Sequence, residues 1–441
     1  MPEHVESSPF TKSSWALLLG FIGYACRLAV TVILTHHLSL ELYGDFTVAW
    51  RTLVFVSLML TFGSAISARR FVSDYVLAKD QRKQSGFTLW IFGLLRRSTI
   101  RLVIAYALFW FMTNILHIID IRWIEKYHLA VFVVILAPVL SVFSIICSYI
   151  LSHGYGLLSA FLNSVVFYGA QLFVIVVFFS VLVPDSITHL SYLLFFTVFF
   201  LLMISAVIAL SIPDMDILKT LLAPRRKRFY DREWIDDAEA AYLNEIVFRM
   251  TFTLNLYLLE IFSPLESHVG ILSVCETWAG VISLVLVCVN LQSISGVHLL
   301  GHLTKPFYAQ MQRHLDLFNV FKLLLSLGFA LFTWYYRELI LVFFNIHDTR
   351  AGILLPWVIF NAYLGDNRYQ FTLLMSKHEA HFVQNTQIAS IILLLVVGTI
   401  LVIPYGMFGV TTATTLSRVL SKIVLTYRCR QLSPMRFNLI G

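Results

Sequence analysis

The stretch LSYLLFFTVFFLLMISAVIALS, residues 190–211, contains no charged side chain and is long enough to cross a bilayer as a helix. About a dozen apolar stretches of comparable length, roughly 20 residues each, run from Trp15 to Tyr427. Hydrophobic residues make up 59% of the chain and charged residues 13%, whereas a soluble domain carries about 25% charged residues. The sequence therefore predicts a polytopic membrane protein, whose function concerns what crosses the membrane.

Each apolar stretch is expected to form a helix, because a segment in lipid has to satisfy its own backbone hydrogen bonds. The runs are continuous rather than alternating, unlike the strands of a membrane barrel. A further segment, 86–97, is expected to be an interfacial amphipathic helix that leads into the third span. The prediction is an all-α fold of about twelve spans. These cover residues 15–35, 45–68, 98–117, 128–150, 158–183, 190–211, 242–262, 269–293, 319–337, 351–375, 386–404 and 408–427.

Basic residues are distributed unevenly between the two sides of the predicted membrane. Of the 32 Lys and Arg residues, 23 fall on the side that carries the N-terminus and five fall within spans. Four fall on the opposite side: Arg122, Lys126, Arg337 and Arg350. Because cytoplasmic loops retain Lys and Arg, both termini of this multi-pass cell-membrane protein are expected in the cytoplasm. The net charge of +7 has the same explanation and does not indicate a nucleic-acid partner.

The chain is expected to form two six-helix lobes, residues 1–211 and 242–441, joined by a cytoplasmic linker at 212–241. The linker contains the basic run RRKR at residues 225–228, followed by several acidic residues. Such a polar segment between two apolar halves is typical of a solvent-exposed connection.

Two short similarities suggest that the lobes are repeats. LELYG (40–44) precedes the second predicted span, and LESHVG (265–270) precedes the eighth. LSHG (151–154) resembles LMSKH (374–378) at nearly the same separation along the chain. Since each half has an even number of spans, such repeats are parallel, related by an axis along the membrane normal. Chance similarity between apolar segments is the alternative explanation.

Several of these segments resemble a known family. LYGDF (42–46), FGSA (62–65) and RRFVS (69–73) are similar to the start of the polysaccharide-biosynthesis flippases, and GMFGVTTA (406–413) resembles the entry to their last span. These proteins belong to the multidrug/oligosaccharidyl-lipid/polysaccharide exporter superfamily. The resemblance implies two lobes around a central cavity that opens alternately to either side. It also implies a functional acid at Glu260, where relatives often carry one.

Two arginines lie within the first two predicted spans. Arg27 and Arg51 are both expected roughly 9–12 Å below the outer membrane boundary, at ~1.5 Å of rise per residue. Charges inside a membrane usually face a bundle interior or a water-filled cavity, and guanidinium groups bind phosphate bidentately. The pair is therefore a candidate site for a phosphate or pyrophosphate. The alternatives are local pairing, with Asp45 as the nearest acid, or snorkelling outward.

The second half carries further charges within its spans. Glu245 and Arg249 are spaced i,i+4 on the seventh span, where they can form a local ion pair. Alternatively, Arg249 is a third cationic substrate contact. Glu276 lies at the depth of Arg51 in the other half, and is expected to be a ligand for coupling Na+ or H+, a partner for an arginine of the other lobe, or a polar anchor within its own lobe.

A polar group of adjacent residues interrupts the tenth predicted span. Asp366, Asn367 and Arg368 are expected to break the helix locally or to line the cavity. An inward-facing structural pair between Asp366 and Arg368 is the alternative. Arg418, in the twelfth span, has no obvious partner and is expected to reach the cytoplasmic interface.

No enzyme signature is present in the sequence. GxxxxGK[ST], HExxH and GxSxG do not occur, and the apolar tract has no cluster of acids suited to glycoside chemistry. The five cysteines show no disulfide or metal-binding pattern. The chain is therefore expected to be a non-enzyme without a metal or a cofactor.

The favoured function is a flippase that moves a lipid-linked oligosaccharide across the membrane, with membrane lipids and polysaccharide-assembly proteins as partners. A drug/cation antiporter of the same superfamily is disfavoured because the first span carries Arg27 and no acid, so that the cavity would repel cations. A membrane glycosyltransferase or polysaccharide polymerase would need a long external loop, and the predicted outer loops are short. A non-transporting scaffold does not explain charges within the spans.

The charge bias makes a direct prediction about topology. Reporter fusions and cysteine labelling should place both termini and the 212–241 linker in the cytoplasm, because most basic residues lie on that side. An external C-terminus, or labelling of the linker from outside, would contradict it.

Overall fold

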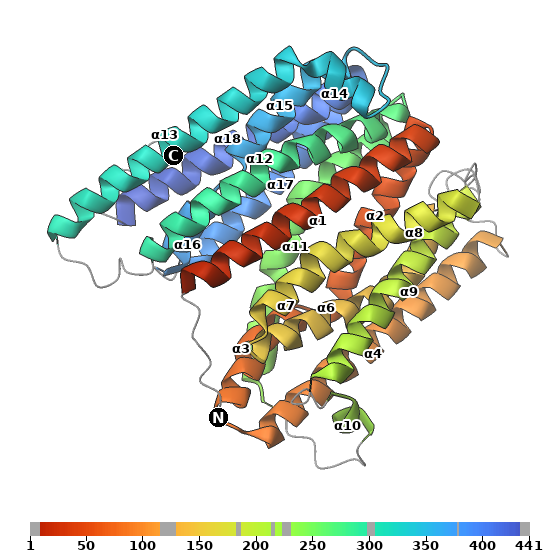
Figure 1. Cartoon of the computed structure of the whole chain (residues 1–441), viewed down its shortest axis with the longest axis vertical. Coiled ribbons are helices and arrows are strands. Elements are labelled where there is room, and N and C mark those ends of the chain that lie inside the picture. The colour runs from red at the N-terminus through yellow and green to blue at the C-terminus, as the bar shows by residue number, and fades with distance from the viewer. Residues whose placement is uncertain are drawn as a thin grey trace. The chain divides into compact units, whose positions relative to one another are not determined.

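The computed structural model describes residues 9–114, 129–181, 187–212, 217–222, 231–297, 305–376 and 379–432, and these ranges contain helices and no strand (Figure 1). The predicted all-α class is therefore confirmed. The basic run at 225–228, and Arg122 and Lys126, lie outside the described residues. The helices are α1 (Pro9–His37), α2 (Leu40–Thr61), α3 (Ser64–Leu77), α4 (Gln81–Asn114), η1 (Val134–Leu136), α6 (Ala137–Ser152), α7 (Gly156–Phe161), η2 (Leu162–Val166), α8 (Phe167–Val181), α9 (Ile187–Ser211), α10 (Ile217–Leu222), α11 (Glu233–Phe262), α12 (Ser267–Val297), α13 (Lys305–Tyr335), α14 (Arg337–Phe343), α15 (Ala351–Leu364), α16 (Arg368–Ser376), α17 (Ala380–Tyr405) and α18 (Met407–Leu432).

Seven helical segments of the described chain are long and apolar enough to cross a membrane on their own. Helices α2 and α3 make an eighth span if they count together, although they are bent by 50° at their junction. Thr253–Phe262 and Ala351–Leu364 are apolar but shorter. Of the remaining predicted spans, 408–427 lies on α18 and the described part of 98–117, residues 98–114, lies on α4; basic side chains lower the hydropathy of both helices. The predicted spans outside these seven helices are therefore bent, shorter or more charged.

The chain divides into two compact units, and each unit contains two separate stretches of the sequence. The first unit contains Met1–Val30 and Asp45–Ile246, and the second contains Thr31–Gly44 and Val247–Gly441. The corner between α1 and α2 therefore belongs to the second unit. The described parts of the predicted linker are mostly helical, since they form α10 and the beginning of α11.

In the first unit, α3 and α9 pack on α6, and α8 lies beside α9 (Figure 1). The chain turns sharply at Phe62 and Gly63, which have φ angles of 47° and 71°. A Cβ on Gly63 would lie 2.2 Å from the carbonyl oxygen of Ala238, so only glycine lets α11 pass this close.

The beginning of α11 is fixed against α3. The indole N–H of the fully buried Trp234 donates to the Tyr75 hydroxyl at 2.7 Å. Arg70 forms ion pairs with Glu233 at 3.1 Å and with Asp237 at 2.8 Å. These contacts hold α11 to the first unit before it enters the second.

The segment 86–97 is helical but not a helix of its own, and its position at the membrane interface stays a prediction. This segment is part of the continuous helix α4, and Phe87, Ile91 and Leu95 are buried along one of its faces. Phe87 packs edge-on against Trp234, with ring centroids 5.2 Å apart. The amphipathic pattern arises because this stripe of apolar residues packs on protein. The spacing of the residues alone does not distinguish packing on protein from packing on a lipid surface.

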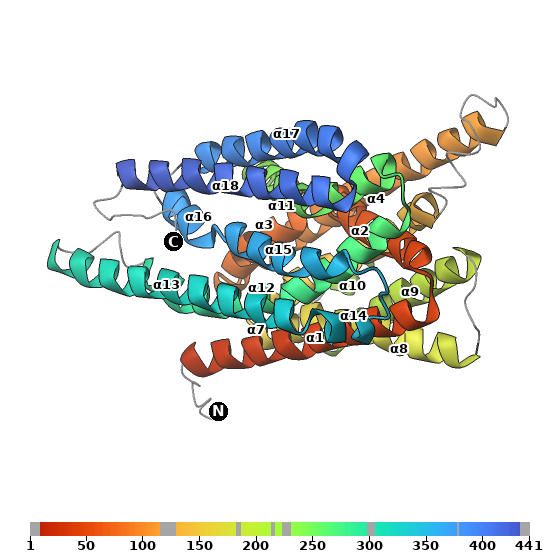
Figure 2. The same ribbon diagram turned by 90° about the horizontal axis from the view of Figure 1, so that it is seen from above.

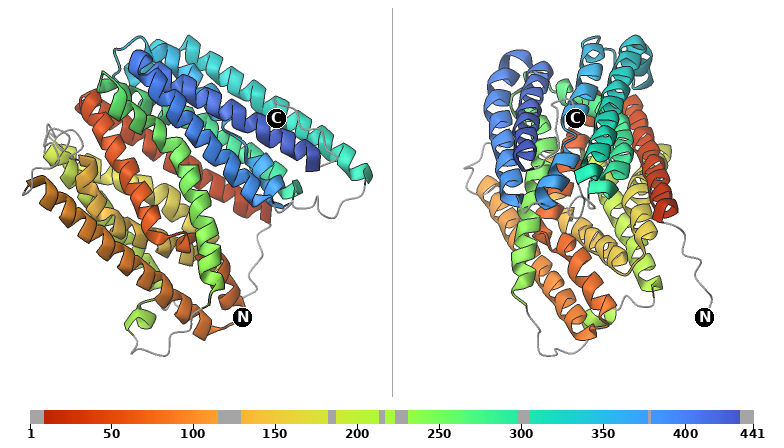
Figure 3. Two further views of the ribbon diagram at one scale, coloured as in Figure 1. Left: turned by 180° about the vertical axis from the view of Figure 1, so that it is seen from behind. Right: turned by 90° about the vertical axis from the view of Figure 1, so that its left-hand side faces the viewer.

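In the second unit, α17 packs on α18, α18 on α15, and α15 on α13 and α12 (Figure 2). Helices α17 and α18, both blue, run side by side as a hairpin in Figure 3. Gly398 and Gly409 lie within this hairpin, and a Cβ on Gly409 would lie 2.1 Å from the carbonyl oxygen of Leu401. Small residues at this position therefore allow the two helices to pack closely.

Corners between consecutive helices meet at one end of the second unit. The amide of Asn345 donates to the Thr35 carbonyl at 3.2 Å, and a Cβ on Gly270 would lie 2.1 Å from the Leu40 carbonyl oxygen. The ring of His268 packs directly against Gly406. The corners that precede α2, α12, α15 and α18 therefore lie together.

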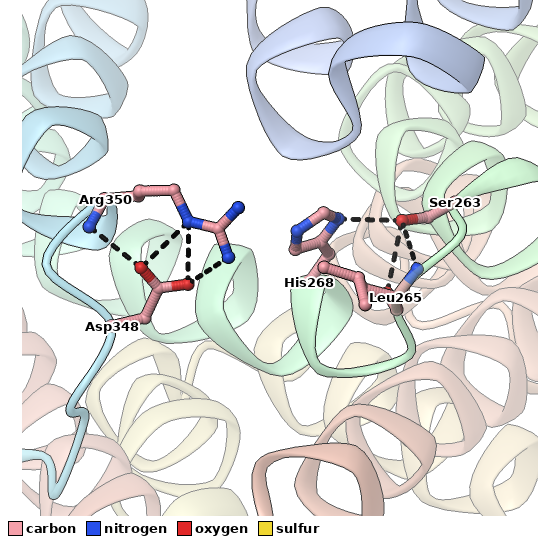
Figure 4. A network of polar contacts seen from close by, with 5 residues as sticks. All are labelled: Ser263, Leu265, His268, Asp348 and Arg350. Atoms are coloured by element: carbon pink, nitrogen blue, oxygen red, sulfur yellow. Dashed lines mark hydrogen bonds and ion pairs between the residues drawn. The ribbon is translucent and has the colours of Figure 1, made fainter.

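A polar network stabilises this end (Figure 4). The Ser263 hydroxyl hydrogen-bonds to His268 Nδ1 at 2.8 Å and donates to the Leu265 carbonyl at 3.1 Å. In the loop between α14 and α15, Arg350 forms an ion pair with Asp348 at 2.8 Å. Hydrogen bonds from Arg350 hold the pKa of the Asp348 carboxyl below its ordinary value.

The packing of Gly270 gives a testable prediction. Gly270→Ala should destabilise the protein by about 1–3 kcal/mol, because the new methyl group meets the Leu40 carbonyl and forces the corner apart. Gly328→Ala is the matched control, since a Cβ there meets nothing within 4 Å. Thermal unfolding of both variants in detergent measures the difference. Equal stability of the two variants would contradict the close packing of this corner.

Candidate functional site

Arg27 lies on α1 in an aromatic environment. Its side chain is half-buried, and its guanidinium carbon lies 5.7 Å from the ring centre of Tyr24 and 5.8 Å from that of Tyr168 on α8. Aromatic faces attract cations, so the two rings stabilise the positive charge of Arg27. They also fix the position of its guanidinium between α1 and α8.

The close packing of α1 depends on Gly23 and on a π-helical turn. A Cβ on Gly23 would lie 2.5 Å from the Ser164 carbonyl oxygen, within the π-helix η2 (Leu162–Val166). π-Helical turns are rare and occur often at functional sites. Here the turn lies immediately before α8, so it sets the direction in which Tyr168 points.

Arg51 lies on α2 and is also half-buried. The adjacent Trp50 packs against Phe167, with ring centroids 5.4 Å apart. Phe167 in turn contacts Tyr168, whose ring lies over Arg27. The structure thus brings the segments that carry both arginines to the beginning of α8, in the first unit. Whether Arg51 pairs with Asp45 stays open.

Sequence reasoning missed the aromatic partners of these arginines. Tyr24 precedes Arg27 by three residues, which places it on the same helix face, and this spacing could have identified it. Tyr168 is distant in sequence, and no local pattern links it to Arg27.

Glu276 lies on α12 in the second unit. The Asn255 amide of α11 donates a short hydrogen bond to its carboxylate. The Glu276 carboxylate also lies close enough to Arg418 for their charges to attract. Glu276 therefore has partners within its own unit, as the polar-anchor alternative requires, and its assignment as a coupling residue stays a prediction.

The expectation that Arg418 reaches the cytoplasmic interface is wrong. Its guanidinium donates to the Asn361 carbonyl at 2.5 Å, and it packs against Gly365. Asn361 lies in the last turn of α15, where carbonyls carry partial negative charge. Its carbonyl also accepts the Gly365 N–H at 3.0 Å, so Arg418 adds a second hydrogen bond at this helix end.

The polar group at the end of α15 both breaks the helix and forms an ion pair. Helix α15 ends at Leu364 and α16 begins at Arg368. Asp366 pairs with Arg368 at 3.9 Å and with Lys322 of α13 at 3.5 Å. The side chains of Lys322 and Asp366 are 8% and 7% exposed, whereas that of Arg368 is 43% exposed. The main partner of Asp366 is therefore the buried lysine, which sequence reasoning missed.

A second buried lysine lies close to this pair. Lys422 of α18 is 4% exposed, and its ammonium nitrogen lies 4.3 Å from the centre of the Tyr363 ring. Both Lys322 and Lys422 fall near predicted span ends, where a lysine is normally expected to reach solvent. The structure instead buries both, together with Asp366 and Tyr363, inside the second unit.

The other predicted site residues lie on α11. Glu260 is 8% exposed, and Arg249 is exposed. The functional acid at Glu260 and the third cationic contact at Arg249 stay predictions.

The arrangement of helices is similar to that of solved transporters. A multidrug resistance MATE family transporter of the MOP superfamily, in an inward-facing conformation, has a TM-score of 0.66 and 12% identity over 96% of this chain and 98% of its own. The outward-facing conformation of such a transporter has a TM-score of 0.59 and 11% identity, over 97% of this chain and 96% of its own. A MOP superfamily transporter from Pyrococcus furiosus Vc1 (DSM3638) has a TM-score of 0.55 and 12% identity, over 97% of this chain and 96% of its own.

The chain has the fold of MOP superfamily transporters. This fold contains about twelve helices in two lobes, as predicted. No protein-family model matches the chain. No curated protein matches it at a significant level. The low identities mean that the likeness concerns the fold alone, and the fold does not distinguish a flippase from a drug transporter.

Proposed function

We propose that this protein is a membrane transporter that flips a lipid-linked oligosaccharide across the cell membrane by alternating access. The observation that carries the proposal is the aromatic-lined Arg27 in the first unit, with Arg51 on the adjacent helix. Arginines within spans usually face a bundle interior or a water-filled cavity. There, a guanidinium can bind an anionic phosphate or pyrophosphate.

The surroundings of the two arginines suit a substrate that is both anionic and rich in sugar. Guanidinium groups bind phosphate oxygens bidentately. Tyr24, Tyr168 and Trp50 present apolar faces together with polar groups, and such amphipathic rings contact ligands of mixed polarity. The polyprenyl tail of the substrate would remain in the bilayer.

A drug/cation antiporter is the second candidate function. Its support is the resemblance in fold to the multidrug resistance MATE family transporters. The polarity of the candidate site favours the flippase, because arginines repel cationic drugs. The transporter from Pyrococcus furiosus is described as having a binding pocket of reverse polarity that suggests a different function. For this chain we propose a preference for anions.

We propose Glu276 as the coupling residue for Na+ or H+. Asp366 is less suited, since it forms a buried ion pair with Lys322. Glu276 is half-buried, accepts a hydrogen bond from the Asn255 amide and lies near Arg418, so a coupling ion would compete with these partners for its carboxylate. Polysaccharide-assembly proteins remain proposed partners of the flippase.

Replacing the arginines tests the proposal. Arg27→Ala and Arg51→Ala should each reduce flipping at least tenfold while leaving membrane abundance unchanged, because each removes a charged contact to phosphate worth about 1.5–3 kcal/mol. Arg→Lys should restore activity only in part, since a point charge replaces a planar fork. Complementation of a flippase-deficient strain, with immunoblots of membranes, measures both quantities.

Arg101→Ala on α4 is the matched control, because that side chain is exposed. Full flipping activity in the Arg27→Ala, Arg51→Ala double variant would refute the anion site. Loss of drug efflux in the same variant, without any effect on glycan export, would favour the antiporter instead.

The coupling proposal predicts a different signature. Glu276→Gln should change the dependence of transport on sodium or pH, since the amide cannot release a proton and binds cations weakly. The measurement is substrate flipping in proteoliposomes under imposed sodium and proton gradients. Asn255→Ala removes the hydrogen bond to Glu276 but keeps the carboxylate, and serves as the control. An unchanged ion dependence in Glu276→Gln would eliminate Glu276 as the coupling residue.

A further inference from the structure

The corner between α11 and α12 contains a buried histidine that the proposed flipping mechanism does not use. His268 is 5% exposed, and its Nδ1 atom is hydrogen-bonded to the Ser263 hydroxyl at 2.8 Å. That hydroxyl donates to the Leu265 carbonyl at 3.1 Å and accepts the Leu265 N–H at 3.3 Å. Because a hydroxyl has one hydrogen to donate, we assign the proton of the neutral ring to Nδ1, which donates to Ser263. The lone pair of the ring is then on Nε2.

The Nε2 edge of the ring faces the loop between α14 and α15 (Figure 4). Nε2 is buried and makes no hydrogen bond to the residues that the structure describes. On the facing side, the Asp348 carboxylate accepts hydrogen bonds from the Arg350 backbone N–H at 2.9 Å and from its guanidinium at 2.8 Å. The charges of Asp348 and Arg350 both act on the His268 ring, with opposite signs. A titratable nitrogen thus faces an ion pair whose carboxylate already has a partner.

Other titratable side chains lie on the elements that meet at this end of the second unit. Those whose charges act on the ring are Asp348 and Arg350. Most of the others are exposed, and His347 lies next to Asp348 in the same loop. The exposed ones are His36, His37, Glu41, Glu266, His347 and Tyr405, and the buried ones are Tyr43 and Glu260.

The imidazole ring has little freedom to turn away from the ion pair. It packs on Gly406, where a Cβ would lie 2.5 Å from the ring carbon Cε1 and 2.6 Å from Nδ1. The side chain of Arg350, in contrast, is 55% exposed, and that of Asp348 is 21% exposed. A change in charge at the ring is therefore met by movement of the arginine, which solvent can accommodate, rather than by movement of the packed ring.

A proton on Nε2 changes which partners are compatible with the ring. Histidine is the side chain that ordinarily gains its charge between about pH 5 and 8. The imidazolium would present a second N–H donor and a positive charge to the Arg350 guanidinium. A buried charge requires a partner of opposite sign, and the carboxylate on this side is that of Asp348. If Asp348 moves from Arg350 to His268, the new N–H has an acceptor and Arg350 is left in solvent.

We propose that His268 is a proton-binding site that controls the loop between α14 and α15. The neutral ring is compatible with the Asp348–Arg350 pair, and the protonated ring takes Asp348 from Arg350. The same loop is bonded to the corner between α1 and α2, because the Asn345 amide donates to the Thr35 carbonyl at 3.2 Å. Protonation therefore loosens this corner of the second unit. The device does not depend on the substrate that the protein transports.

Hydrogen–deuterium exchange of the full-length protein in detergent tests the proposal, with peptides that cover residues 345–352. Wild type and His268→Asn are compared at the same pH, between pH 5.5 and 7.5, so that the pH dependence of chemical exchange cancels. The asparagine amide keeps a donor near the position of Nδ1 but does not titrate. The proton binds the rearranged loop more tightly than the observed one, so acid favours the rearranged loop. Exchange in wild type should equal that in His268→Asn at pH 7.5. Below about pH 6.5 it should exceed it, by up to about tenfold per pH unit, the limit for one proton.

Two further variants test which groups are responsible. Arg350→Gln should raise the midpoint of the pH dependence by about one unit, because it removes both the competing partner of Asp348 and the positive charge that faces the ring. His347→Gln is the matched control, since His347 is an exposed histidine of the same loop. Its exchange should follow that of wild type at every pH.

Equal exchange in wild type and His268→Asn across the whole pH range would overturn the proposal. Loss of the pH dependence in His347→Gln would also overturn it, because another histidine would then be the site. If His268→Asn does not elute as a folded protein on size exclusion, Arg350→Gln and His347→Gln decide, and an unchanged midpoint in Arg350→Gln would refute the exchange of partners. None of these outcomes affects the flipping proposal, which the Arg27 and Arg51 variants test on their own.

Discussion

A segment in lipid has to satisfy its own backbone hydrogen bonds, and this constraint determines most of the structure. Regular helices satisfy these hydrogen bonds internally. Other partners are needed only where a helix is interrupted. The chain turns at Phe62 and Gly63, adopts a π-helical turn at Leu162–Val166, and breaks between Leu364 and Arg368. Each interruption frees or displaces backbone groups, and each lies against a specific partner: α11, α1 and Arg418, respectively.

Charged side chains are constrained in a similar way, because an interior of low dielectric tolerates a charge only when it has interaction partners. In the first unit, Arg27 lies over the aromatic rings of Tyr24 and Tyr168. In the second unit, Lys322 and Asp366 form an ion pair, while Arg418 binds a carbonyl at a helix end. The two units therefore hold arginine differently: one places it against aromatic rings, and the other places it at the end of a helix.

The sequence was sufficient for the fold class, because continuous apolar runs between charged loops have one physical solution. It also predicted a break near Asp366, since three polar residues in an apolar span oppose a regular helix. The partners were not predictable. Lys322 and Lys422 lie near span ends, where a local pattern indicates snorkelling, and their burial depends on contacts among α13, α15, α16 and α18. The stripe of Phe87, Ile91 and Leu95 was similarly ambiguous, because its spacing does not say whether protein or lipid covers it.

The π-helical turn before α8 has a consequence for how this chain tolerates changes in length. A π-helical turn holds one residue more than an α-helical turn, so the loss of any single residue between Leu162 and Val166 would restore a regular helix. All later side chains of α8 would then rotate by about 100°. Tyr168 would leave Arg27, although neither residue had been replaced. The cationic site is thus specified by a residue count as well as by residue identities, and an insertion or deletion here would alter it more than most substitutions.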